Sequence, residues 1–568
     1  MKKLLLSFIL VFGFSLCEGQ SWVWGREAVP NSSKCYGDPS NDHCVAIDAL
    51  GNVYITSSFR DTLSFGSFTV IDTGYDENTF IAKYDANGNI LWVQQPTLKG
   101  YYCSATYRSV AVDAKGNSYV AGGFHDTISL GSVTLRNKDN SDAFLVKYDV
   151  NGNLVWAKQS FAASPSSSGY IDAVTIDSTG EIYASGTFAD TITFGSITLK
   201  NKSFGVFLVK YDSSGNVIWA KQDSSVSTSD GGSAYSIALD NSGGIYITGY
   251  FDDTIWFKGI RLIENPSLLD VFITKYDTSG NVLWAKQAFP GNKNSYGVGT
   301  SIALDGSGDA YVTGSFKDSL TFGGTTLISL GHEDVFLVKY SPSGNVLWAK
   351  QGHNTGTCGG YAVVCDTLIR GGGNLIILRN GSPAQIIFGS DTFSLLTSYT
   401  TSTVLLQFDS SGKVSCGNIF TEGNEDDYDG LGIDHAGKYV YLFGDLDKST
   451  VFGTDTLIYG RDVPFVARWQ PCNNIETSTT LISTKTSISL FPNPNTGAFT
   501  LEVKSEELKA KSVEVYNVMG QKVFAETLRS TQDDNPIDIQ DQPNGIYLYR
   551  VIDETGKLLG EGKFVIAH

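Results

Sequence analysis

Short apolar stretches separated by polar turns run along most of this chain, and their lengths are those of β-strands. In residues 301–351 the apolar stretches are 301–305, 310–316, 335–341 and 346–351, with a further apolar pair at 319–328. The breaks between them carry Gly, Asn, Asp or Ser. Short runs bounded by such residues predict hairpins. We therefore expect four main strands in this unit, here numbered first to fourth, and an extra hairpin between the second and the third.

The same unit recurs seven times. Its most regular segment, the third strand, reads FIAKYD or FLVKYD in the early units, VLLQFD in the sixth and FVARWQ in the seventh. These segments begin at Phe80, Phe144, Phe207, Phe272, Phe336, Val404 and Phe465, which lie 61 to 68 residues apart. A fixed period of this size indicates a repeat architecture. Four-stranded units repeated about an axis form a β-propeller, so the predicted fold is all-β with seven blades.

The two ends of the repeat region predict that the propeller is closed. The seventh unit stops after its third strand, while residues 22–27 (WVWGRE) align with residues 282–287 (VLWAKQ), a fourth strand. We expect the N-terminal strand to complete the last blade. An open array would instead need capping repeats with a polar outer face.

Four segments follow from the composition. Residues 1–19 combine a Lys pair with a short apolar run, which is typical of a secretory signal peptide and too short to span a membrane. Residues 20–472 hold the propeller. Residues 473–486 are rich in Thr and Ser and predict a flexible linker. Residues 487–568 alternate strands with Gly turns and predict a small β-sandwich. The net charge of −18 disfavours nucleic acid, and no other apolar stretch could span a bilayer.

Disulfides are expected in an exported protein. In the sixth unit, Cys416 replaces the Trp of the fourth strand. In the seventh unit, Cys472 follows the third strand, so these two cysteines could join adjoining blades. Two further candidate pairs are close in sequence and could staple loops: Cys35 with Cys44, and Cys358 with Cys365. Cys103 would be left over. A zinc site is the alternative, but no Cys-x-x-Cys or paired His spacing occurs in the sequence.

The strand directions predict which face binds a partner. The turns after the first and third strands share one face and carry Asp-x-x-Gly-Asn, a local turn motif. The extra hairpins and the fourth-to-first connections share the other, variable face, where we expect a partner to dock. The connections are predicted at residues 27–43, 95–108, 159–171, 222–234, 287–299, 351–360 and 418–430.

Candidate chemistry on this face is limited. Glu422, Glu425, Asp426, Asp427 and Asp429 form an acidic cluster that could bind calcium or could be a solvated loop. Tyrosines in or near the connections could stack on sugars: Tyr36, Tyr101, Tyr102, Tyr107, Tyr170, Tyr296 and Tyr428. The repeated Trp of the fourth strand is expected to pack between blades. The sequence contains no Gly-x-Ser-x-Gly elbow, no phosphate loop and no metal-spaced His, so no catalytic residues and no cofactor are predicted.

The chain resembles known families in two places. Residues 109–159 (SVAVDAKGNSYVAGG…DAFLVKYDVNGNLVWAKQ) resemble the bacterial β-propeller repeat called SBBP and also NHL-type blades, which implies a propeller but no reaction or ligand. The C-terminal segment is similar to the type A sorting domain of the type IX secretion system. The matching residues are Pro492, Asn493, Pro494, Gly497, Asn544, Gly545 and Tyr547, with the segments 516–520 and 562–566.

The expected function is that of an exported binding or adhesion module. The sorting resemblance implies passage through the type IX secretion machinery, removal of the domain, and release or attachment at the outer-membrane surface. The surface ligand, a glycan or a protein, is not given by the sequence. The alternative is a polysaccharide-active enzyme, a hydrolase or lyase, on the same scaffold.

Overall fold

The computed structural model divides into a repeat domain, Met1–Asn474, and a C-terminal domain, Ile475–His568. The structure describes residues 21–30, 37–38, 44–72, 77–137, 140–162, 166–225, 231–252, 254–263, 269–292, 294–329, 333–354, 357–365, 374–381, 385–388, 391–394, 401–421, 427–434, 439–446, 450–452, 455–457, 463–470, 487–491, 496–504, 510–517, 521–527, 535–553 and 558–567. All regular elements among these residues are strands. The predicted signal peptide lies outside the described residues.

The fourth unit shows the sheet that the repeat builds. Its first to fourth strands are β21 (Gly232–Leu239), β22 (Ile245–Phe251), β25 (Asp270–Tyr276) and β26 (Val282–Gln287). They pair antiparallel in the order β21-β22-β25-β26. The middle two strands are buried along most of their length, which explains their continuous apolar sequence.

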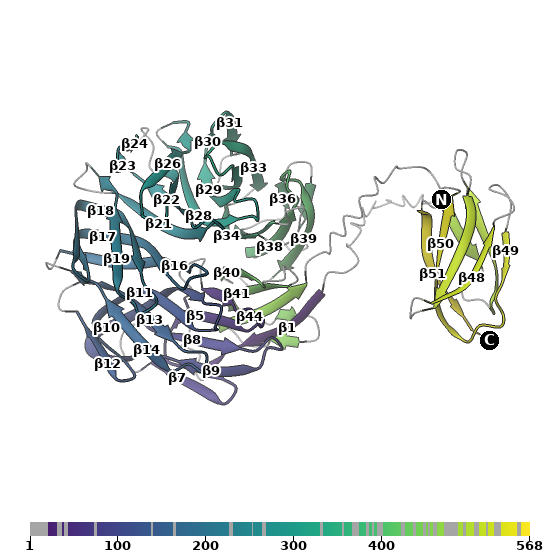
Figure 1. The fold of residues 1–568 in the computed structure, drawn as a ribbon, viewed down its shortest axis with the longest axis horizontal. Helices are drawn as coiled ribbons and strands as arrows, with labels where there is room; N and C mark the ends of the chain where they lie inside the picture. The colour runs from purple at the N-terminus through teal and green to yellow at the C-terminus, as the bar shows by residue number, and fades with distance from the viewer. Residues whose placement is uncertain are drawn as a thin grey trace, which may run out of the picture. The chain divides into compact units, whose positions relative to one another are not determined.

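The other units repeat this order, and Figure 1 shows their sheets arranged around a common centre. Unit 1 contains β4 (Val45–Ile47), β5 (Val53–Phe59), β8 (Asn78–Tyr84) and β9 (Ile90–Gln94). Unit 2 contains β10 (Thr97–Val112), β11 (Ser118–Leu130), β13 (Asp142–Tyr148) and β14 (Leu154–Gln159). Unit 3 contains β16 (Ser168–Ile176), β17 (Ile182–Phe194), β18 (Ile197–Tyr211) and β19 (Val217–Gln222). Unit 5 contains β28 (Tyr296–Leu304), β29 (Ala310–Lys317), β32 (Asp334–Tyr340) and β33 (Val346–Asn354). Unit 6 contains β34 (Thr357–Cys365), β35 (Asn374–Gly381), β38 (Thr401–Phe408) and β39 (Val414–Thr421).

The seventh unit takes its fourth strand from the start of the chain. It contains β40 (Asp427–Ile433), β41 (Val440–Leu446) and β44 (Val463–Gln470), and β1 (Ser21–Glu27) pairs antiparallel with β44. Trp24 faces Arg468 in the register, just as Trp348 faces Lys339 in the fifth unit. The ring centroids of Trp24 and Tyr441 lie 6.0 Å apart, and those of Trp348 and Tyr311 in the fifth unit lie 5.9 Å apart. The N-terminal strand therefore occupies the position predicted for it.

Neighbouring units are tied by a common Trp contact. The Trp92 indole Nε1 donates to the Val150 carbonyl 3.1 Å away in the next unit. A side chain on Gly152 would collide with the Trp92 ring, so the turn glycine admits the indole. The same bond joins Trp24 of the seventh unit to Ala86 of the first at 3.1 Å. The expected packing role of the Trp is thus observed between units.

The extra hairpins also join neighbouring units. The clearest pairs are β6 (Thr62–Phe65) with β7 (Phe68–Ile71), β23 (Ile255–Phe257) with β24 (Ile260–Leu262), β30 (Ser319–Phe322) with β31 (Thr325–Ile328), β36 (Gln385–Phe388) with β37 (Asp391–Ser394) and β42 (Thr450–Phe452) with β43 (Asp455–Leu457). Short strands that leave the preceding unit add to three of them: β2 (Val29–Pro30) to β6, β20 (Ser224–Ser225) to β23 and β27 (Phe289–Pro290) to β30. In the hairpin of unit 6, the end of β33 itself pairs antiparallel with β36.

A repeated Gln fastens each hairpin to its own sheet. The Gln287 side chain accepts a bond from the Ile263 backbone N–H at 3.0 Å and donates to its carbonyl at 2.8 Å. Gln95, Gln159, Gln222 and Gln351 make the same pair of bonds in their units. The side-chain amide therefore imitates a neighbouring strand at the end of the hairpin.

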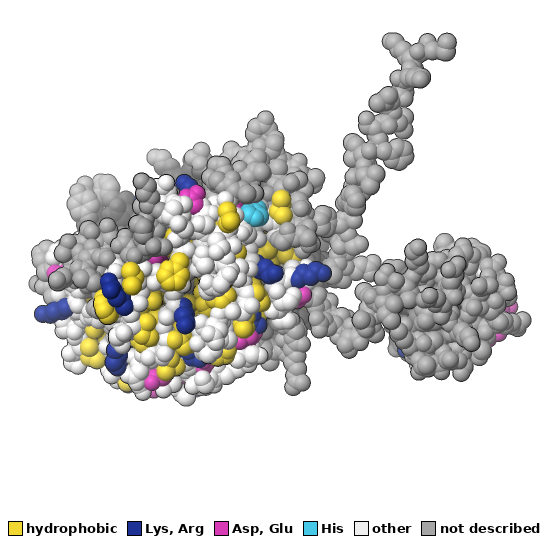
Figure 2. Space-filling view, turned by 90° about the horizontal axis from the view of Figure 1, so that it is seen from above, with side chains coloured by type: hydrophobic (Ala, Val, Ile, Leu, Met, Phe, Trp, Pro, Cys, Tyr) yellow, Lys and Arg dark blue, Asp and Glu magenta, His cyan; other side chains and the backbone are white. Residues whose placement is uncertain are grey.

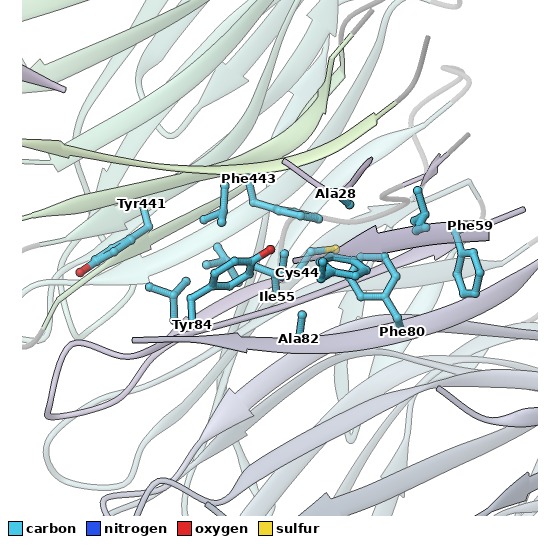
Figure 3. Packing of buried hydrophobic residues seen from close by; sticks show 14 of the residues in the cluster. Ala28, Cys44, Ile55, Phe59, Phe80, Ala82, Tyr84, Tyr441 and Phe443 are labelled. Carbon is cyan, nitrogen blue, oxygen red and sulfur yellow. The ribbon is translucent and has the colours of Figure 1, made fainter. Parts of the chain in front are cut away.

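The core is divided among the interfaces between units. One cluster joins Ile55 and Phe80 of the first unit to Tyr441 and Phe443 of the seventh. Figure 3 shows these side chains packed between the two sheets. On the outside, one apolar residue of the fourth strand stays exposed in six units: Val23, Leu91, Val155, Ile218, Leu283 and Leu347. Figure 2 shows such apolar side chains interspersed with Lys and Arg across the described surface.

The C-terminal domain consists of two facing sheets. One contains β45 (Ser487–Phe491), β46 (Ala498–Lys504) and β49 (Asn535–Asp538). The other contains β48 (Lys522–Thr527), β47 (Ala510–Asn517), β50 (Gly545–Asp553) and β51 (Leu558–Ile566) in that order. Phe499 from the first sheet meets Phe564 from the second at 4.5 Å between ring centroids, which places a shared core between them.

Candidate functional site

One residue in the first strand of units 2 to 7 bulges out of the strand pairing. In β10 the register jumps from Tyr107↔Gly122 to Ser109↔Ala121, so Arg108 has no partner position on β11. A β-bulge of this kind redirects the extra residue and is common next to binding sites. The bulge residues are Arg108, Asp172, Tyr235, Thr300, Tyr361 and Asp429. Each lies five residues before an Asp of the following turn, a sequence position that His43, outside the described residues, holds in unit 1.

A glycine on the second strand makes room for the bulge. A side chain on Gly122 would collide with the carbonyl oxygen of Thr106, and one on Gly186 would collide with that of Tyr170. Gly249 and Gly314 meet carbonyl oxygens in the same way. A Gly within a buried strand indicates close backbone approach. The backbone shape of the bulge is therefore fixed in these units, while the residue carried on it differs from unit to unit.

The first strands lie next to one another around the centre of the repeat domain. β10 contacts β4 and β16, β21 contacts β16 and β28, β34 contacts β28 and β40, and β40 contacts β4. Hydrogen bonds join them directly after the bulges: Ser109 Oγ accepts from the Val174 N–H, and Ser236 Oγ from the Ile302 N–H, each at 3.0 Å. Bulge residues of adjacent units are thereby brought within contact distance.

A cavity of about 310 Å³ opens where units 2, 3 and 4 meet. Three bulge residues, Arg108, Asp172 and Tyr235, line it together with Thr187 and Tyr250. Tyr170, Phe204, Ser233, Asp252 and two glycines complete the lining. This volume falls within the range of small-molecule sites. The cavity therefore gathers aromatic and charged groups from three different repeats.

An ion pair between Arg108 and Asp172 lines the cavity. Arg108 Nη1 lies 2.5 Å from Asp172 Oδ1, and Thr187 Oγ1 donates to Asp172 Oδ2 at 3.0 Å. Asp172 is only 1% exposed, and this burial raises the pKa of its carboxyl although Arg108 acts in the opposite direction. Arg108 Nε is buried without a hydrogen-bond partner among the described residues.

Aromatic rings form the walls. The Arg108 guanidinium lies 4.4 Å from the centroid of Tyr170, whose hydroxyl is hydrogen-bonded to Ser141. Tyr235 and Tyr250 meet at 5.5 Å with their planes tilted by 53°. Burial, together with the hydrogen bond to Tyr250, raises the pKa of the Tyr235 hydroxyl. The arrangement can hold a ring-shaped ligand against aromatic faces while Tyr hydroxyl groups bond to its edge.

The predicted connections end too late in the chain. The sequence placed residues 95–108, 159–171 and 222–234 outside strands, yet β10, β16 and β21 begin at Thr97, Ser168 and Gly232. The bulge is the reason, because it interrupts the alternation by which a strand is detected. Of the predicted tyrosines, Tyr170 lines the cavity, whereas Tyr107 is fully buried against Phe144. Sequence patterns did not identify Arg108, Asp172, Tyr235 and Tyr250 as site residues; the glycine in each second strand was the available signal.

The predicted acidic cluster is only partly described. Asp427 and Asp429 lie in β40, with Asp429 as its bulge residue, and not in a connecting loop. Glu422, Glu425 and Asp426 lie outside the described residues. Calcium binding by these five residues stays a prediction.

One predicted disulfide is wrong. Cys358 and Cys365 both lie in the single strand β34, seven residues apart. Seven strand residues span about 23 Å, whereas the Cα atoms of a disulfide lie within about 7 Å of each other. Cys35 and Cys472 lie outside the described residues, so the pairings Cys35–Cys44 and Cys416–Cys472 stay predictions. Cys416 does pair with Gln407 as Trp348 pairs with Lys339, which confirms that it replaces the Trp.

The predicted sorting residues hold the C-terminal domain together where they are described. Gly497 has a φ of +89°, and a side chain there would meet the backbone of Gln540. Tyr547 is buried, stacks on Phe564 and donates from its hydroxyl to the Pro543 carbonyl at 2.8 Å. Asn544 lies in the bend before β50, and Gly545 is the first residue of that strand. Pro492, Asn493 and Pro494 lie outside the described residues.

These features define an all-β repeat protein with a separate C-terminal sandwich, and the sandwich has a known family. Residues 489–567 match the family described as a secretion system C-terminal sorting domain, that of the type IX system. The protein is therefore secreted or attached to the outer-membrane surface, and it interacts with the secretion machinery. Among the described residues, no helix is long and apolar enough to cross a membrane.

Similarity over the repeat domain is lower. A WD repeat-containing protein, L264, of Acanthamoeba polyphaga mimivirus is 24% identical over 404 residues, covering 58% of this chain and 28% of its own. The regulatory protein FlaEY of Caulobacter vibrioides is 27% identical over 143 residues, covering 25% of this chain and 14% of its own. The chain thus spans less than a third of either relative.

Solved structures with similar folds include two further proteins. The Dos1 propeller has a TM-score of 0.39 and 12% identity and covers 80% of this chain and 97% of its own. PorZ, a bacterial surface component of the type IX secretion system of Porphyromonas gingivalis, has a TM-score of 0.30 and 10% identity. It covers 92% of this chain and 70% of its own.

Proposed function

We propose that this protein is an exported binding module, built as a closed seven-bladed β-propeller of SBBP-type repeats and displayed or released through its sorting domain. The convergence of Arg108, Asp172 and Tyr235 in one open cavity carries this proposal. Three repeats with a common backbone place three chemically different side chains there. A purely structural ring would have no need for such differences.

Binding is favoured over catalysis by the state of the carboxyl group. Both oxygens of Asp172 are engaged, one by Arg108 and the other by Thr187. A general acid or base needs a free oxygen within reach of the substrate. The alternative, a polysaccharide-active enzyme, draws its support from Asp252, a second carboxyl residue in the same lining.

The deciding experiment applies the labelled full-length protein to arrays of glycans and of surface proteins, together with a reducing-sugar release assay. We expect retention on one class of probe, loss of retention in Tyr235→Ala and no release of reducing ends. Thr300→Ala, a bulge substitution in unit 5 outside the cavity, serves as the matched control. Sugar release that Asp172→Asn abolishes would establish the enzyme instead. Retention unchanged in Tyr235→Ala would remove the cavity from the function.

Calcium binding at Glu422, Glu425, Asp426, Asp427 and Asp429 is a separate proposal. It predicts that calcium raises the melting temperature and that EDTA reverses the change. An unchanged melting temperature across a calcium titration would contradict it.

A further inference from the structure

We infer that the cavity bounded by Arg108, Asp172, Tyr235 and Tyr250 binds a neutral saccharide unit. This inference rests on the proposed binding function and names the class of its ligand. It follows from three properties of the cavity: its charge, its free aromatic surface and its tyrosine hydroxyl groups.

Charge argues against an anionic ligand. Among the described residues of the lining, Arg108 is the one basic residue, and its guanidinium lies 2.5 Å from the Asp172 carboxyl group. Asp252 lines the same cavity, so the described lining contains two acidic residues and one basic residue. The whole chain carries a net charge of −18, so an approaching anion is also repelled at long range. Sulfated or uronate sugars and phosphorylated ligands are therefore disfavoured.

A cationic ligand is disfavoured by the position of Arg108. Cations bind over aromatic faces, and the Arg108 guanidinium already occupies the face of Tyr170 at 4.4 Å. That face is therefore not available to a ligand cation. The acidic character of the lining is thus offset at the place where a cation would bind.

The free aromatic surface fits a sugar ring. Tyr235 and Tyr250 form a tilted pair, and Phe204 is 48% exposed at the same cavity. A pyranose presents C–H groups on its faces, which pack on such rings, and hydroxyl groups around its edge. Tyr235 and Tyr250 both line the cavity, so their hydroxyl groups can bond to the hydroxyls of such a ring. The cavity therefore matches a ligand that is uncharged, polar at its edge and apolar on its face.

The test is calorimetry on the full-length protein with three probes of equal length: neutral gluco-, manno- or galacto-oligosaccharides, an oligogalacturonate, and an oligolysine peptide. We expect measurable affinity for a neutral oligosaccharide only. Tyr235→Ala and Tyr250→Ala should each weaken that affinity roughly tenfold or more, because each removes an aromatic contact. Tyr235→Phe should bind more tightly than Tyr235→Ala, since the ring is retained.

The controls separate this inference from the broader function. Thr300→Ala should bind like the native protein, and circular dichroism should show each variant folded. Tight binding of oligogalacturonate or oligolysine that Tyr235→Ala abolishes would overturn the saccharide inference while the binding function stands. Neutral-sugar affinity that both tyrosine variants leave unchanged would also overturn it, by placing the sugar elsewhere. Absence of binding to every probe and every array member would overturn both proposals.

Discussion

Asp223 offers the most direct test of how burial governs stability in this repeat. It follows β19 and is 1% exposed. Its backbone N–H donates to the Val206 carbonyl at 3.1 Å, and its Oδ1 accepts from the Val206 N–H at 2.7 Å. Its Oδ2 is buried without a hydrogen-bond partner among the described residues. In the preceding unit Ser160 makes the same two bonds to Ala143, at 2.8 and 2.9 Å. Asp223→Ser therefore replaces the carboxyl by a group that the fold already uses at this position.

The expected effect depends on pH. Burial raises the pKa of Asp223 from its usual 3.8 to about 7. Below pH 4 both the folded and the unfolded chain carry the protonated acid, so the carboxyl has no electrostatic effect on stability. As the pH rises, the unfolded chain releases this proton first, and folding becomes less favourable until about pH 7. A rise from 3.8 to about 7 corresponds to about 4 kcal/mol at a pH above both values. Asp223→Ser should remove this destabilisation at pH 8 and change little below pH 4.

Urea unfolding followed by Trp fluorescence at several values between pH 4 and 8 measures this difference. Ser160→Asp is the reciprocal control, and it should introduce a destabilisation that grows over the same pH range. If the unfolding free energies of the native protein and Asp223→Ser run parallel across the range, proton linkage at Asp223 is refuted. A constant offset would then reflect packing alone.

Three further predictions concern other parts of the chain. Trp219→Ala should lower the unfolding free energy by about 2–4 kcal/mol, because the Trp219 ring packs on Gly280 of the next unit. The control Ile218→Ala, on the exposed side of the strand, should change the unfolding free energy little, and equal effects of the two substitutions would contradict the packing role. Glu514→Gln should speed proteolysis of the C-terminal domain at pH 7, since hydrogen bonds from Lys522 and other neighbours lower the pKa of the Glu514 carboxyl to about 2. The stabilisation of the domain by the ionised carboxyl is present above about pH 4.5 and should fade as the pH falls toward 2. Non-reducing peptide mapping should recover Cys416 joined to Cys472, and recovery of both as alkylated thiols would exclude the bond.

Local patterns predicted most of the fold because the repeat is built from local devices. The Asp85 turn is one example: its Oδ1 accepts from the N–H groups of Asn87 and Asn89, and Asn89 Nδ2 donates back to its Oδ2. Such a turn is encoded in five residues, so the strands on either side are found from sequence alone. The N-terminal strand was found in the same way, since Trp24 stands in a segment that matches the other fourth strands.

The candidate site was not predictable from the same patterns, because it depends on a bulge and on contacts between units. Arg108 lies where the alternation of β10 changes phase, so the sequence pattern began the strand only after that residue. Its partner, Asp172, lies 64 residues away in the next unit. The Cys358–Cys365 pairing failed for a related reason: closeness in sequence was taken as closeness in space, although both cysteines lie in one extended strand.

The bulges explain how a symmetric scaffold can build an asymmetric site. If strand pairing were regular, the first strand would alternate strictly between its two faces, and a change of side chain would disturb the packing between units. The bulge separates the two requirements. Ser109 and Ser236, directly after it, keep the bonds to the next unit, whereas Arg108 and Tyr235 are released from pairing and differ freely. Substitution of Gly122 by Ala should therefore damage the fold, because the Thr106 carbonyl occupies the space beside it, whereas Tyr235→Ala should leave the fold intact and alter only the cavity.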